Sequence, residues 1–380
     1  MSRIVVVNNV SLGGDSPVVI QTMWKDRLSD SDLEGEAGAE TVRRVERLSQ
    51  MGCGLLRFAV PDIGAAETLG RLAGMVSMPL VADIHFDYQI ALRCMDFPIA
   101  KIRVNPGNIG GRDKVRAVLE KAGERGIPLR IGVNAGSLPR DLREGGGAGA
   151  GASDIAKALV EAAERELALC GEFNFTNVVV SMKASGIADT IRANRILAAK
   201  TDAPLHIGVT EAGPLVAGTA RSAAALAVLL AEGVGDTLRV SLSDSMENEV
   251  IAAREICAAA AEIAALDGEP QTAGRAPSRA LSRLRRGGVT VVSCPRCGRH
   301  RFDTHGFTSR WMARLYALNR DLTVAIMGCE VNGPEEARHA DVGVTGSGDK
   351  ALIFRHGAVV RAVPAEEADE AFAKELGLSP

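Results

Sequence analysis

Three cysteines close to the C-terminal end of the sequence have the spacing of a metal site. Cys294 and Cys297 form a C-P-R-C segment that follows the β-branched run VTVVS, and Cys329 ends a second apolar run. A C-x-x-C segment places two thiols on one tight turn, as both structural zinc sites and iron–sulfur sites require. The chain has seven cysteines, and the other four stand singly in apolar or helical contexts, which is typical of small buried hydrophobic residues.

The spacing alone leaves the metal open between zinc and an iron–sulfur cluster. A closed zinc site takes four ligands, and a nearby histidine (His300, His305 or His339) could be the fourth. A redox-active dithiol is a weaker third interpretation, because no thioredoxin-like context surrounds the C-x-x-C. A cluster held by three cysteines would leave one iron open to a weaker ligand or a substrate, and three carboxylates follow Cys329 closely: Glu330, Glu335 and Glu336.

A second group of reactive side chains stands at or near the ends of β-branched runs in the first 265 residues. If these runs form a closed parallel barrel, their carboxyl ends share one mouth, where the chemistry of such barrels takes place. Structural ion pairs or strand caps are the simpler explanation for any single member, so the set as a whole is the signal. The residues are Arg57, Asp83, His85, Arg103, Asn105, Arg130, Asn134, Lys183, His206, Glu211, Arg239 and Ser241.

Four cations of this set come from four different runs: Arg57, Arg103, Arg130 and Lys183. They would repel one another at the mouth unless an anion bound among them. Arginine forks suit phosphate oxygens, and the glycine-containing loops 105–111 and 134–137 can add backbone N–H groups. We therefore expect a phosphorylated substrate. The carboxylates Asp83 and Glu211, with Asp244 as a further candidate, could move a proton or orient a hydroxyl group, and Glu211 is the best acid/base candidate.

The elements that must position these residues alternate along the chain. Helical stretches separate the runs, and several of them end in glycine, as helices often do. Eight alternating units predict a (β/α)8 TIM-like barrel; an open doubly wound sheet is less favoured, because no G-x-G-x-x-G follows the first run. The predicted strands are 18–23, 55–60, 80–85, 101–106, 129–134, 178–183, 205–211 and 237–244.

The composition of the later segments predicts two domains. We expect a substrate-binding barrel over 1–265, a linker rich in Pro, Gly and Arg over 266–288 with mostly solvated arginines, and a small α/β cluster domain over 289–380. A glycine-rich segment, 143–153, is expected to be a flexible surface loop.

Charge and composition exclude several functions. The net charge of -3 and an aromatic content of 3% argue against a nucleic-acid-binding protein. No apolar run is long enough for a membrane span or a signal peptide, so we expect a cytoplasmic protein without a membrane partner.

Ordered motifs over nearly the whole chain resemble those of the 4-hydroxy-3-methylbut-2-en-1-yl diphosphate synthases, the iron–sulfur enzymes of the non-mevalonate isoprenoid pathway. The motifs are VADIHFDYQIAL (81–92), RVNPGNIG (103–110), RIGVNAGSL (130–138), VSMKAS (180–185), LHIGVTEAG (205–213), GDTLRVSLS (235–243), SCPRCGR (293–299) and MGCEVNGP (327–334).

The resemblance implies a reaction: ring opening and two-electron reductive dehydroxylation of 2-C-methyl-D-erythritol 2,4-cyclodiphosphate to the linear diphosphate. It implies a flavodoxin or ferredoxin as electron donor and a homodimer. It also implies a [4Fe–4S] cluster on Cys294, Cys297, Cys329 and Glu336, with Glu336 acting in catalysis. The implied diphosphate pocket is Arg57, Arg103, Arg130, Asn134, Lys183, Arg239 and Ser241, and His206 is added to it as a strand-end residue.

The chain departs from the family pattern at three places. The third cysteine is followed by N-G-P-E-E (332–336) where the family usually has N-G-P-G-E, so Glu335 stands beside Glu336 as a possible ligand. The first strand is followed by Q-T-M-W-K-D (21–26) instead of Q-S-M-T-N-T. The segment 145–151 has more glycine than the family pattern. A non-redox zinc protein with a partner-binding C-terminal domain remains the alternative from another class, and a plain electron carrier is disfavoured by the cationic mouth.

Overall fold

A computed structural model gives the structure of the chain and describes residues 1–143, 154–266, 279–284, 288–295, 297–318, 320–329 and 333–379. The glycine-rich segment therefore lies almost entirely outside the described residues. The chain divides into two compact units, Met1–Arg286 and Gly287–Pro380.

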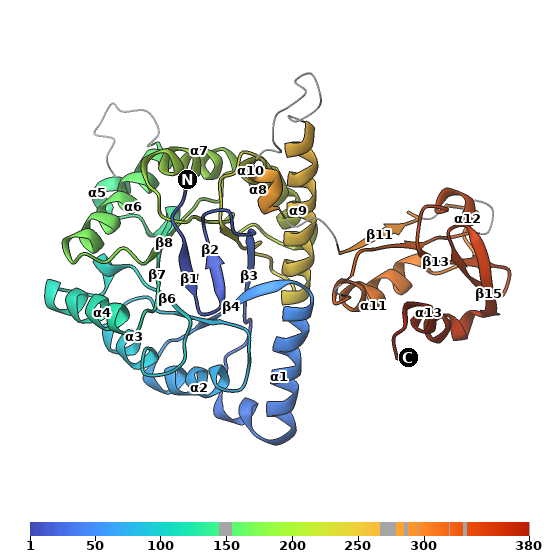
Figure 1. Cartoon of the computed structure of the whole chain (residues 1–380), viewed down its shortest axis with the longest axis horizontal. Helices are drawn as coiled ribbons and strands as arrows, with labels where there is room; N and C mark the ends of the chain where they lie inside the picture. The colour runs from blue at the N-terminus through green and yellow to red at the C-terminus, as the bar shows by residue number, and fades with distance from the viewer. Residues whose placement is uncertain are drawn as a thin grey trace. The chain divides into compact units, whose positions relative to one another are not determined.

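The first unit is built around eight parallel strands (Figure 1). The sheet order is β8-β7-β6-β5-β4-β3-β10-β9, and a bridge between Val180 and Leu205 joins its two ends, β8 and β9. This closes the barrel and confirms the predicted fold class. The strands are β3 (Val19–Met23), β4 (Cys53–Ala59), β5 (Leu80–Asp83), β6 (Lys101–Arg103), β7 (Leu129–Asn134), β8 (Val178–Lys183), β9 (His206–Ile207) and β10 (Thr237–Leu238).

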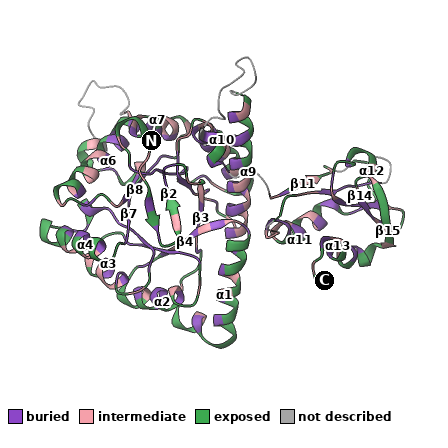
Figure 2. Ribbon diagram, viewed as in Figure 1, coloured by how far each residue is buried: buried purple, intermediate pink, exposed green. Residues whose placement is uncertain are grey.

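Helices follow every barrel strand and cover the outside of the barrel, with buried residues facing inward and exposed residues outward (Figure 2). Aspartates begin three of them: Asp62 and Asp87 accept hydrogen bonds from Ala65 N and Gln89 N, both at 2.8 Å, and Asp154 accepts one from Lys157 N at 3.4 Å. The helices are α1 (Gly35–Gln50), α2 (Ile63–Ala73), α3 (Tyr88–Cys94), α4 (Arg112–Glu124), α5 (Arg140–Arg143), α6 (Ile155–Glu172), α7 (Ile187–Lys200), α8 (Leu215–Ala231) and α9 (Met246–Leu266). Among the described residues, no helix is both long and apolar enough to cross a bilayer.

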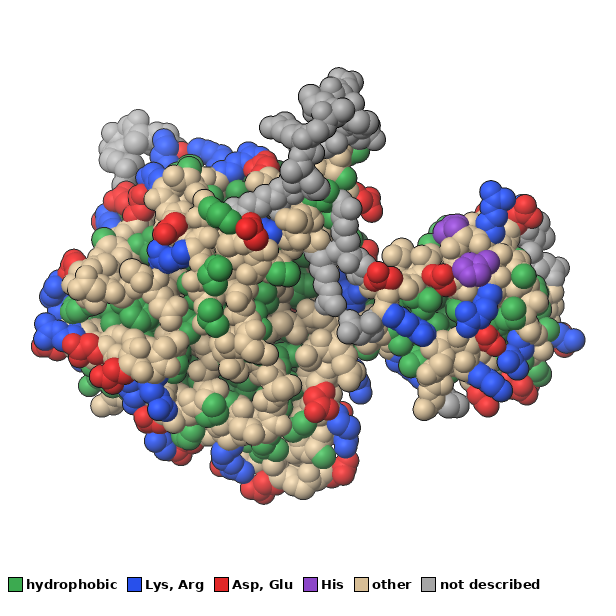
Figure 3. Space-filling model, viewed as in Figure 1, with side chains coloured by type: hydrophobic (Ala, Val, Ile, Leu, Met, Phe, Trp, Pro, Cys, Tyr) green, Lys and Arg blue, Asp and Glu red, His purple; other side chains and the backbone are tan. Residues whose placement is uncertain are grey.

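A hairpin of β1 (Val5–Val7) and β2 (Val10–Leu12) covers the amino end of the barrel, which the sequence analysis did not predict. Its inner face packs on residues at the amino ends of the barrel strands, including Leu55, Val81 and Val179. In the view of Figure 3, charged side chains gather around the edge of the barrel unit and are sparse at its centre. The amino end is thus sealed by apolar contacts, which leaves the carboxyl end as the open one.

The short helix α10 (Arg279–Arg283) lies within the segment predicted to be a linker, yet it belongs to the barrel unit. Arg283 is buried, and its Nη2 forms an ion pair of 2.5 Å with Asp236. The expectation of solvated arginines was therefore wrong for Arg283, because sequence composition does not show which linker residues fold back onto a core.

The second unit contains a five-stranded sheet in the order β11-β12-β13-β14-β15, parallel from β11 to β13 and antiparallel beyond. Trp311, Phe307 and Phe372 form its aromatic core, with Trp311 edge-on to Phe372 at 4.9 Å. The elements are β11 (Val289–Ser293), α11 (Thr304–Tyr316), β12 (Leu322–Ile326), α12 (Gly333–Glu336), β13 (Val342–Ser347), β14 (Lys350–Arg355), β15 (Ala358–Pro364) and α13 (Ala368–Leu376).

Candidate active site at the barrel mouth and the cysteine edge

The predicted cations converge inside the carboxyl end of the barrel. Arg57, on β4, is repelled by Arg103 and Arg239, and Lys183 is repelled by Arg130, Arg239 and Arg57. These side chains come from five places around the barrel, so they surround one region. Only two buried carboxylates of the described residues, Asp83 and Glu249, interact with the group. The region is therefore suited to a polyanion.

Two glycines make room for these cations. A Cβ atom on Gly132 would lie 2.6 Å from Arg103 Nε, and one on Gly208 would lie 2.9 Å from Lys183 Nζ and 2.6 Å from the Arg239 carbonyl oxygen. A side chain at Gly208 would collide with backbone, and a side chain at Gly132 would force the Arg103 guanidinium to shift. The glycines of the R-I-G-V-N and H-I-G-V-T motifs thus let charged side chains of neighbouring strands cross the barrel interior.

Asp83 lies between two of the guanidinium groups. Arg57 Nη2 donates to Asp83 Oδ2 at 2.9 Å, Arg103 Nη1 lies 3.4 Å from Oδ1, and His85 Nε2 is 3.6 Å from Oδ2. Burial alone would raise the pKa of Asp83, but Arg57, His85 and Arg103 bring it well below its ordinary value. Asp83 therefore stays ionised near neutral pH and acts as a fixed counter-ion rather than a proton donor.

Arg130 and Lys183 are buried cations with too little compensation. Burial lowers the pKa of each well below its ordinary value, and neighbouring arginines lower it further. Arg130 Nε and Nη1 lack a hydrogen-bond partner within the described part of the chain. Buried donors of this kind are costly to leave unsatisfied, so ligand oxygens at this position would stabilise the fold as well as bind.

His206 and Lys101 extend the group deeper into the barrel. Both are fully buried, and burial followed by nearby cations lowers the pKa of each well below its ordinary value. His206 Nδ1 lies 3.4 Å from Thr237 Oγ1. A neutral imidazole can donate or accept one hydrogen bond without adding charge. Lys101 was not among the predicted site residues, because it opens the run KIRV rather than ending it.

The uncharged predicted residues have different environments. Asn134 and Ser241 are half-buried, the first at the end of β7 and the second just after β10. Asn105 is buried and joins β6 to β7, since it both donates to the Gly132 carbonyl at 2.9 Å and accepts from the Gly132 N–H at 2.7 Å. Asn105 thus holds two strand ends together, whereas the other two retain exposed area at the mouth.

Glu211 is exposed in the loop after β9 and has φ = 52°, a left-handed conformation that a glutamate rarely adopts. Such a conformation costs on the order of 1–3 kcal/mol and is often found at functional sites. Asp244, the weaker carboxylate candidate, instead accepts hydrogen bonds from Ser245 N and Asn248 Nδ2 at the start of α9. It therefore has a capping role in this structure.

Glu249, which binds Arg239, was not predicted from the sequence. Arg239 Nε and Nη2 donate to the two carboxylate oxygens of Glu249 at 3.1 and 2.9 Å, and Lys25 forms an ion pair with the same carboxylate. Glu249 lies in the first turn of α9, and Lys25 lies in the loop after β3. Only the polar sequence Q-T-M-W-K-D, which departs from the family pattern, indicated that this loop was unusual.

Two of the three predicted cysteine ligands, Cys294 and Cys329, follow neighbouring strands of the second sheet. Cys294 directly follows β11 and donates its N–H to Ile326 O at 2.9 Å, and Cys329 comes shortly after β12, the neighbouring parallel strand. The Cys294 sulfur would lie 3.3 Å from a Cβ atom on Gly328, the residue before Cys329. Cys297 is exposed, and all three cysteines are free thiols.

Glu336 ends α12, whose first residue, Gly333, donates its N–H to the Cys329 carbonyl at 3.0 Å. Both Glu335 and Glu336 are exposed. No group of three His, Cys, Asp or Glu side chains in the described ranges is already placed to hold one ion. The donor types still suit an iron–sulfur cluster, since two free thiols follow neighbouring parallel strands and a glycine lies where the Cys294 sulfur approaches the second strand end.

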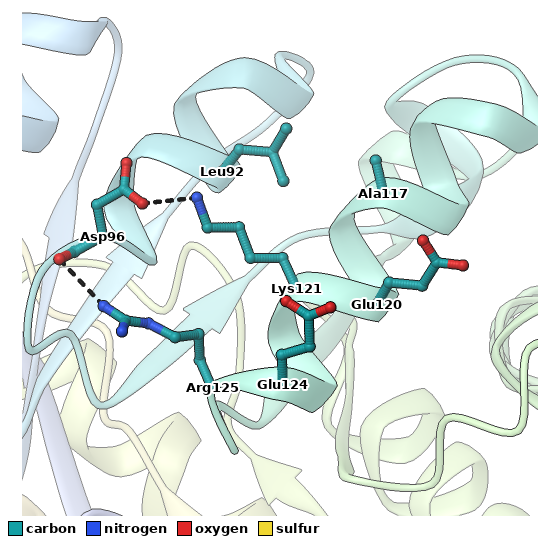
Figure 4. A pocket seen from close by; sticks show the side chains of 7 residues that line it. All are labelled: Leu92, Asp96, Ala117, Glu120, Lys121, Glu124 and Arg125. Atoms are coloured by element: carbon teal, nitrogen blue, oxygen red, sulfur yellow. Dashed lines mark hydrogen bonds and ion pairs between the residues drawn. The ribbon is translucent and has the colours of Figure 1, made fainter.

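A hollow of about 410 Å³ on the outside of the barrel has no part in this site. It lies between α3 and α4, and the two basic side chains that line it already have partners (Figure 4). Lys121 Nζ donates to Asp96 Oδ1 at 2.7 Å, and Arg125 Nη2 donates to the Asp96 carbonyl at 3.1 Å. None of the predicted site residues lines it.

A closed (β/α)8 barrel with a cationic mouth, followed by a small α/β unit with free thiols at one sheet edge, defines a two-unit barrel enzyme. Family models described as "GcpE TIM-barrel domain" and "GcpE protein C-terminal domain" match residues 2–254 and 290–377. The chain belongs to the GcpE family, the 4-hydroxy-3-methylbut-2-en-1-yl diphosphate synthases.

Curated relatives match almost the whole chain. The 4-hydroxy-3-methylbut-2-en-1-yl diphosphate synthase (flavodoxin) of Treponema pallidum is 48% identical over 96% of this chain and 85% of its own length. The Treponema denticola enzyme is 44% identical over 97% of this chain and 95% of its own length. The Geobacter sulfurreducens enzyme is 41% identical over 99% of this chain and 97% of its own length. The predicted family and enzyme class are thus confirmed.

Solved structures of dihydropteroate synthases resemble the barrel only distantly. The Xanthomonas albilineans enzyme is 15% identical over 72% of this chain and 99% of its own, with a TM-score of 0.44. No functional argument follows from a similarity of this size.

Proposed function

We propose that the barrel mouth anchors the diphosphate of the substrate, while an iron–sulfur cluster held by Cys294, Cys297 and Cys329 supplies the electrons. The reaction is the reductive conversion of 2-C-methyl-D-erythritol 2,4-cyclodiphosphate to 4-hydroxy-3-methylbut-2-en-1-yl diphosphate in isoprenoid biosynthesis. The ring C–O bond and the C–OH bond of a neighbouring hydroxyl group both break, two electrons are taken up as a C=C bond forms, and the hydroxyl oxygen takes a proton and leaves as water. The substrate site of this proposal is Arg57, Arg103, Arg130, Asn134, Lys183, His206, Arg239 and Ser241.

The buried excess of positive charge is the observation that carries the substrate site. Arg130 and Lys183 are strongly desolvated and lie among further guanidinium groups. A diphosphate carries two to three negative charges and can offer oxygens to several forks at once. When the diphosphate binds, charge-assisted hydrogen bonds to its oxygens replace the repulsion among the buried cations. The fixed cations then hold the ring in one orientation, which lowers the entropic part of the barrier.

The two carboxylates have separate roles in this proposal. Asp83 stays ionised and keeps Arg57 and Arg103 in place, because its pKa lies well below its ordinary value. Glu211 lies at the rim, where an exposed carboxyl group can exchange protons with solvent and deliver one to the departing hydroxyl oxygen. The left-handed backbone of Glu211 fixes the direction in which its side chain leaves the loop.

The cofactor of the proposal is a [4Fe–4S] cluster on Cys294, Cys297, Cys329 and Glu336. When bound, it supplies electrons one at a time and an iron that acts as a Lewis acid. Thiolates suit such iron, whereas a carboxylate is a weaker ligand and can yield its position to substrate. The relatives carry "flavodoxin" in their names, so we propose a flavodoxin as the donor, with ferredoxin as the other possibility. We also propose a homodimer.

An anaerobic absorbance spectrum with iron and sulfide analysis, repeated after addition of the cyclodiphosphate, tests the proposal. We expect a band near about 400 nm from iron–sulfur charge transfer, about four irons per chain, and a spectral change with substrate. Cys329→Ala should lose the colour and the turnover, while Cys257→Ala, at a buried thiol in α9, should keep both. A colourless wild-type protein with one zinc per chain would establish the zinc-protein alternative instead. Full turnover by Cys329→Ala would contradict the ligand assignment.

A further inference from the structure

We propose that Glu249 is a positioning residue for the substrate anion: it fixes the Arg239 guanidinium at the mouth, and Lys25 offsets the negative charge that this requires. The inference rests on the proposed diphosphate site and concerns residues outside its predicted set. Glu249 is 1% exposed, whereas the side chains of Arg239 and Lys25 are 12% and 27% exposed. The carboxylate is thus hidden beneath two cations that reach the mouth.

The Glu249 carboxylate is saturated with donors from three segments. Oε2 accepts from Thr22 Oγ1 at 2.6 Å and from Arg239 Nε at 3.1 Å. Oε1 accepts from Arg239 Nη2 at 2.9 Å, from Leu242 N at 3.0 Å and from Lys25 Nζ. Since Glu249 stands in the first turn of α9, the helix N-terminus also favours its charge. Both oxygens are therefore fixed in position, and so is whatever they bind.

Arg239 needs such an anchor because its neighbours repel it. Arg57, Arg130 and Lys183 each interact unfavourably with Arg239. A long arginine side chain at the rim of that group would turn outward to water if nothing held it. Glu249 engages Nε and Nη2, while the partner of Nη1 among the described residues is the sulfur of Met23, at 3.5 Å. Nη1 is therefore the guanidinium nitrogen that can donate a hydrogen bond to a ligand oxygen.

Lys25 compensates for the positive charge that the Glu249 carboxylate neutralises at Arg239. A carboxylate next to Arg239 would cancel its charge and weaken its attraction for a diphosphate. Lys25 adds a second cation to the same carboxylate, so Lys25, Glu249 and Arg239 together carry a charge of about +1. Lys25 Nζ also donates to the Leu242 carbonyl at 3.0 Å, which ties the loop after β3 to the segment after β10.

Substitution of Glu249 separates positioning from simple charge, because the two effects have opposite signs. Glu249→Gln removes a negative charge near an anion site and should by charge alone strengthen anion binding. If Glu249 instead positions Arg239, the variant should bind inorganic pyrophosphate and the cyclodiphosphate more weakly, by roughly tenfold or more. Losses of this size are typical when a residue that orients a binding group is removed. The loss should appear mainly in KM and in the pyrophosphate inhibition constant rather than in kcat.

The measurement uses the full-length holoenzyme, with pyrophosphate as competitive inhibitor at two ionic strengths. Glu232→Gln is the matched control, because it removes one carboxylate charge from the C-terminal end of α8, where Glu232 pairs with Arg195. Lys25→Met should raise the pyrophosphate inhibition constant about threefold or more and make that constant less dependent on ionic strength. A purely structural role of Glu249 would instead predict that Glu249→Gln lowers the thermal midpoint with little effect on pyrophosphate inhibition.

Unchanged or tighter pyrophosphate inhibition in folded Glu249→Gln would overturn the inference. If that variant does not fold, Lys25→Met decides, and an inhibition constant equal to that of the wild type overturns it. Failure of the proposed function looks different: the wild-type enzyme itself would neither turn over the cyclodiphosphate nor be inhibited by pyrophosphate.

Discussion

Arg57 and Asp83 form an ion pair of 2.9 Å across the neighbouring strands β4 and β5, at the carboxyl end of the barrel. Asp83 is 2% exposed and also lies within 3.4 Å of Arg103. A buried carboxylate shared by two guanidinium groups compensates only part of their charge. The pair therefore sets the geometry of the mouth while leaving it positive, which is the condition that an anionic substrate needs.

Asp83→Asn should destabilise the barrel by about 3 kcal/mol, because it leaves two guanidinium groups uncompensated. The pKa of Asp83 is lower in the folded state than in the unfolded chain, so its contribution is fully present above about pH 4 and is lost as the pH falls further. Urea unfolding at pH 7 and pH 3 measures this. The difference between wild type and variant should be large at pH 7 and smaller at pH 3. Equal stability at pH 7 would contradict the role.

Lys183→Met should raise the thermal midpoint of the barrel by a few degrees and abolish diphosphate binding. Burial and the neighbouring arginines lower the pKa of Lys183 well below its ordinary value, so the folded state disfavours its charge at every pH below about 10. Inorganic pyrophosphate should stabilise the wild type and not the variant. Lys200→Met, at an exposed lysine that pairs with Glu164, is the control. A lower midpoint in Lys183→Met would show that the lysine is compensated in the folded state.

The sequence predicted the barrel well because each strand has a β-branched run and a polar end. The observed strands are shorter than predicted where the chain turns early into the mouth, as at β9, which contains only His206 and Ile207. The hairpin β1–β2 was missed although a signal was present: Asn8 and Asn9 separate two valine-rich runs, and Asn8 has φ = 55°. Asparagine pairs of this kind favour tight hairpin turns.

The cationic part of the site was predictable because strand ends of a closed barrel share one mouth. Glu249 was not, since it lies on a helix ten residues after Arg239 and no strand-end rule reaches it. Lys101 was missed because its side chain enters the barrel from the beginning of β6. Burial of a lysine at a strand start depends on the closure of the barrel around it, which sequence patterns do not show.

His206 should make the barrel less stable as the pH falls below about 6.5. Burial, followed by Lys183 and Arg130, lowers the pKa of His206 well below its ordinary value, so the unfolded chain takes up a proton that the folded chain does not. Stability should fall by up to about 1.4 kcal/mol per pH unit between roughly pH 6.5 and pH 5. His206→Asn should remove this slope, whereas His305→Asn, in the second unit, should leave it. An unchanged slope in His206→Asn would mean that the imidazole titrates normally.

Replacement of Glu336, but not of Glu335, should alter the cluster. The two residues are consecutive in α12, so their side chains leave the helix about 100° apart and only one can turn toward the cysteines. We expect Glu336→Gln to lower the iron and sulfide content per chain and to speed loss of the visible absorbance in air, with turnover reduced at least about tenfold. Glu335→Gln has the same change in charge on the same helix and should match the wild type in all three measurements. The reverse result, with loss in Glu335→Gln alone, would assign the fourth ligand to Glu335 and would mean that the E-E sequence of this chain shifts the ligand by one residue from the family pattern.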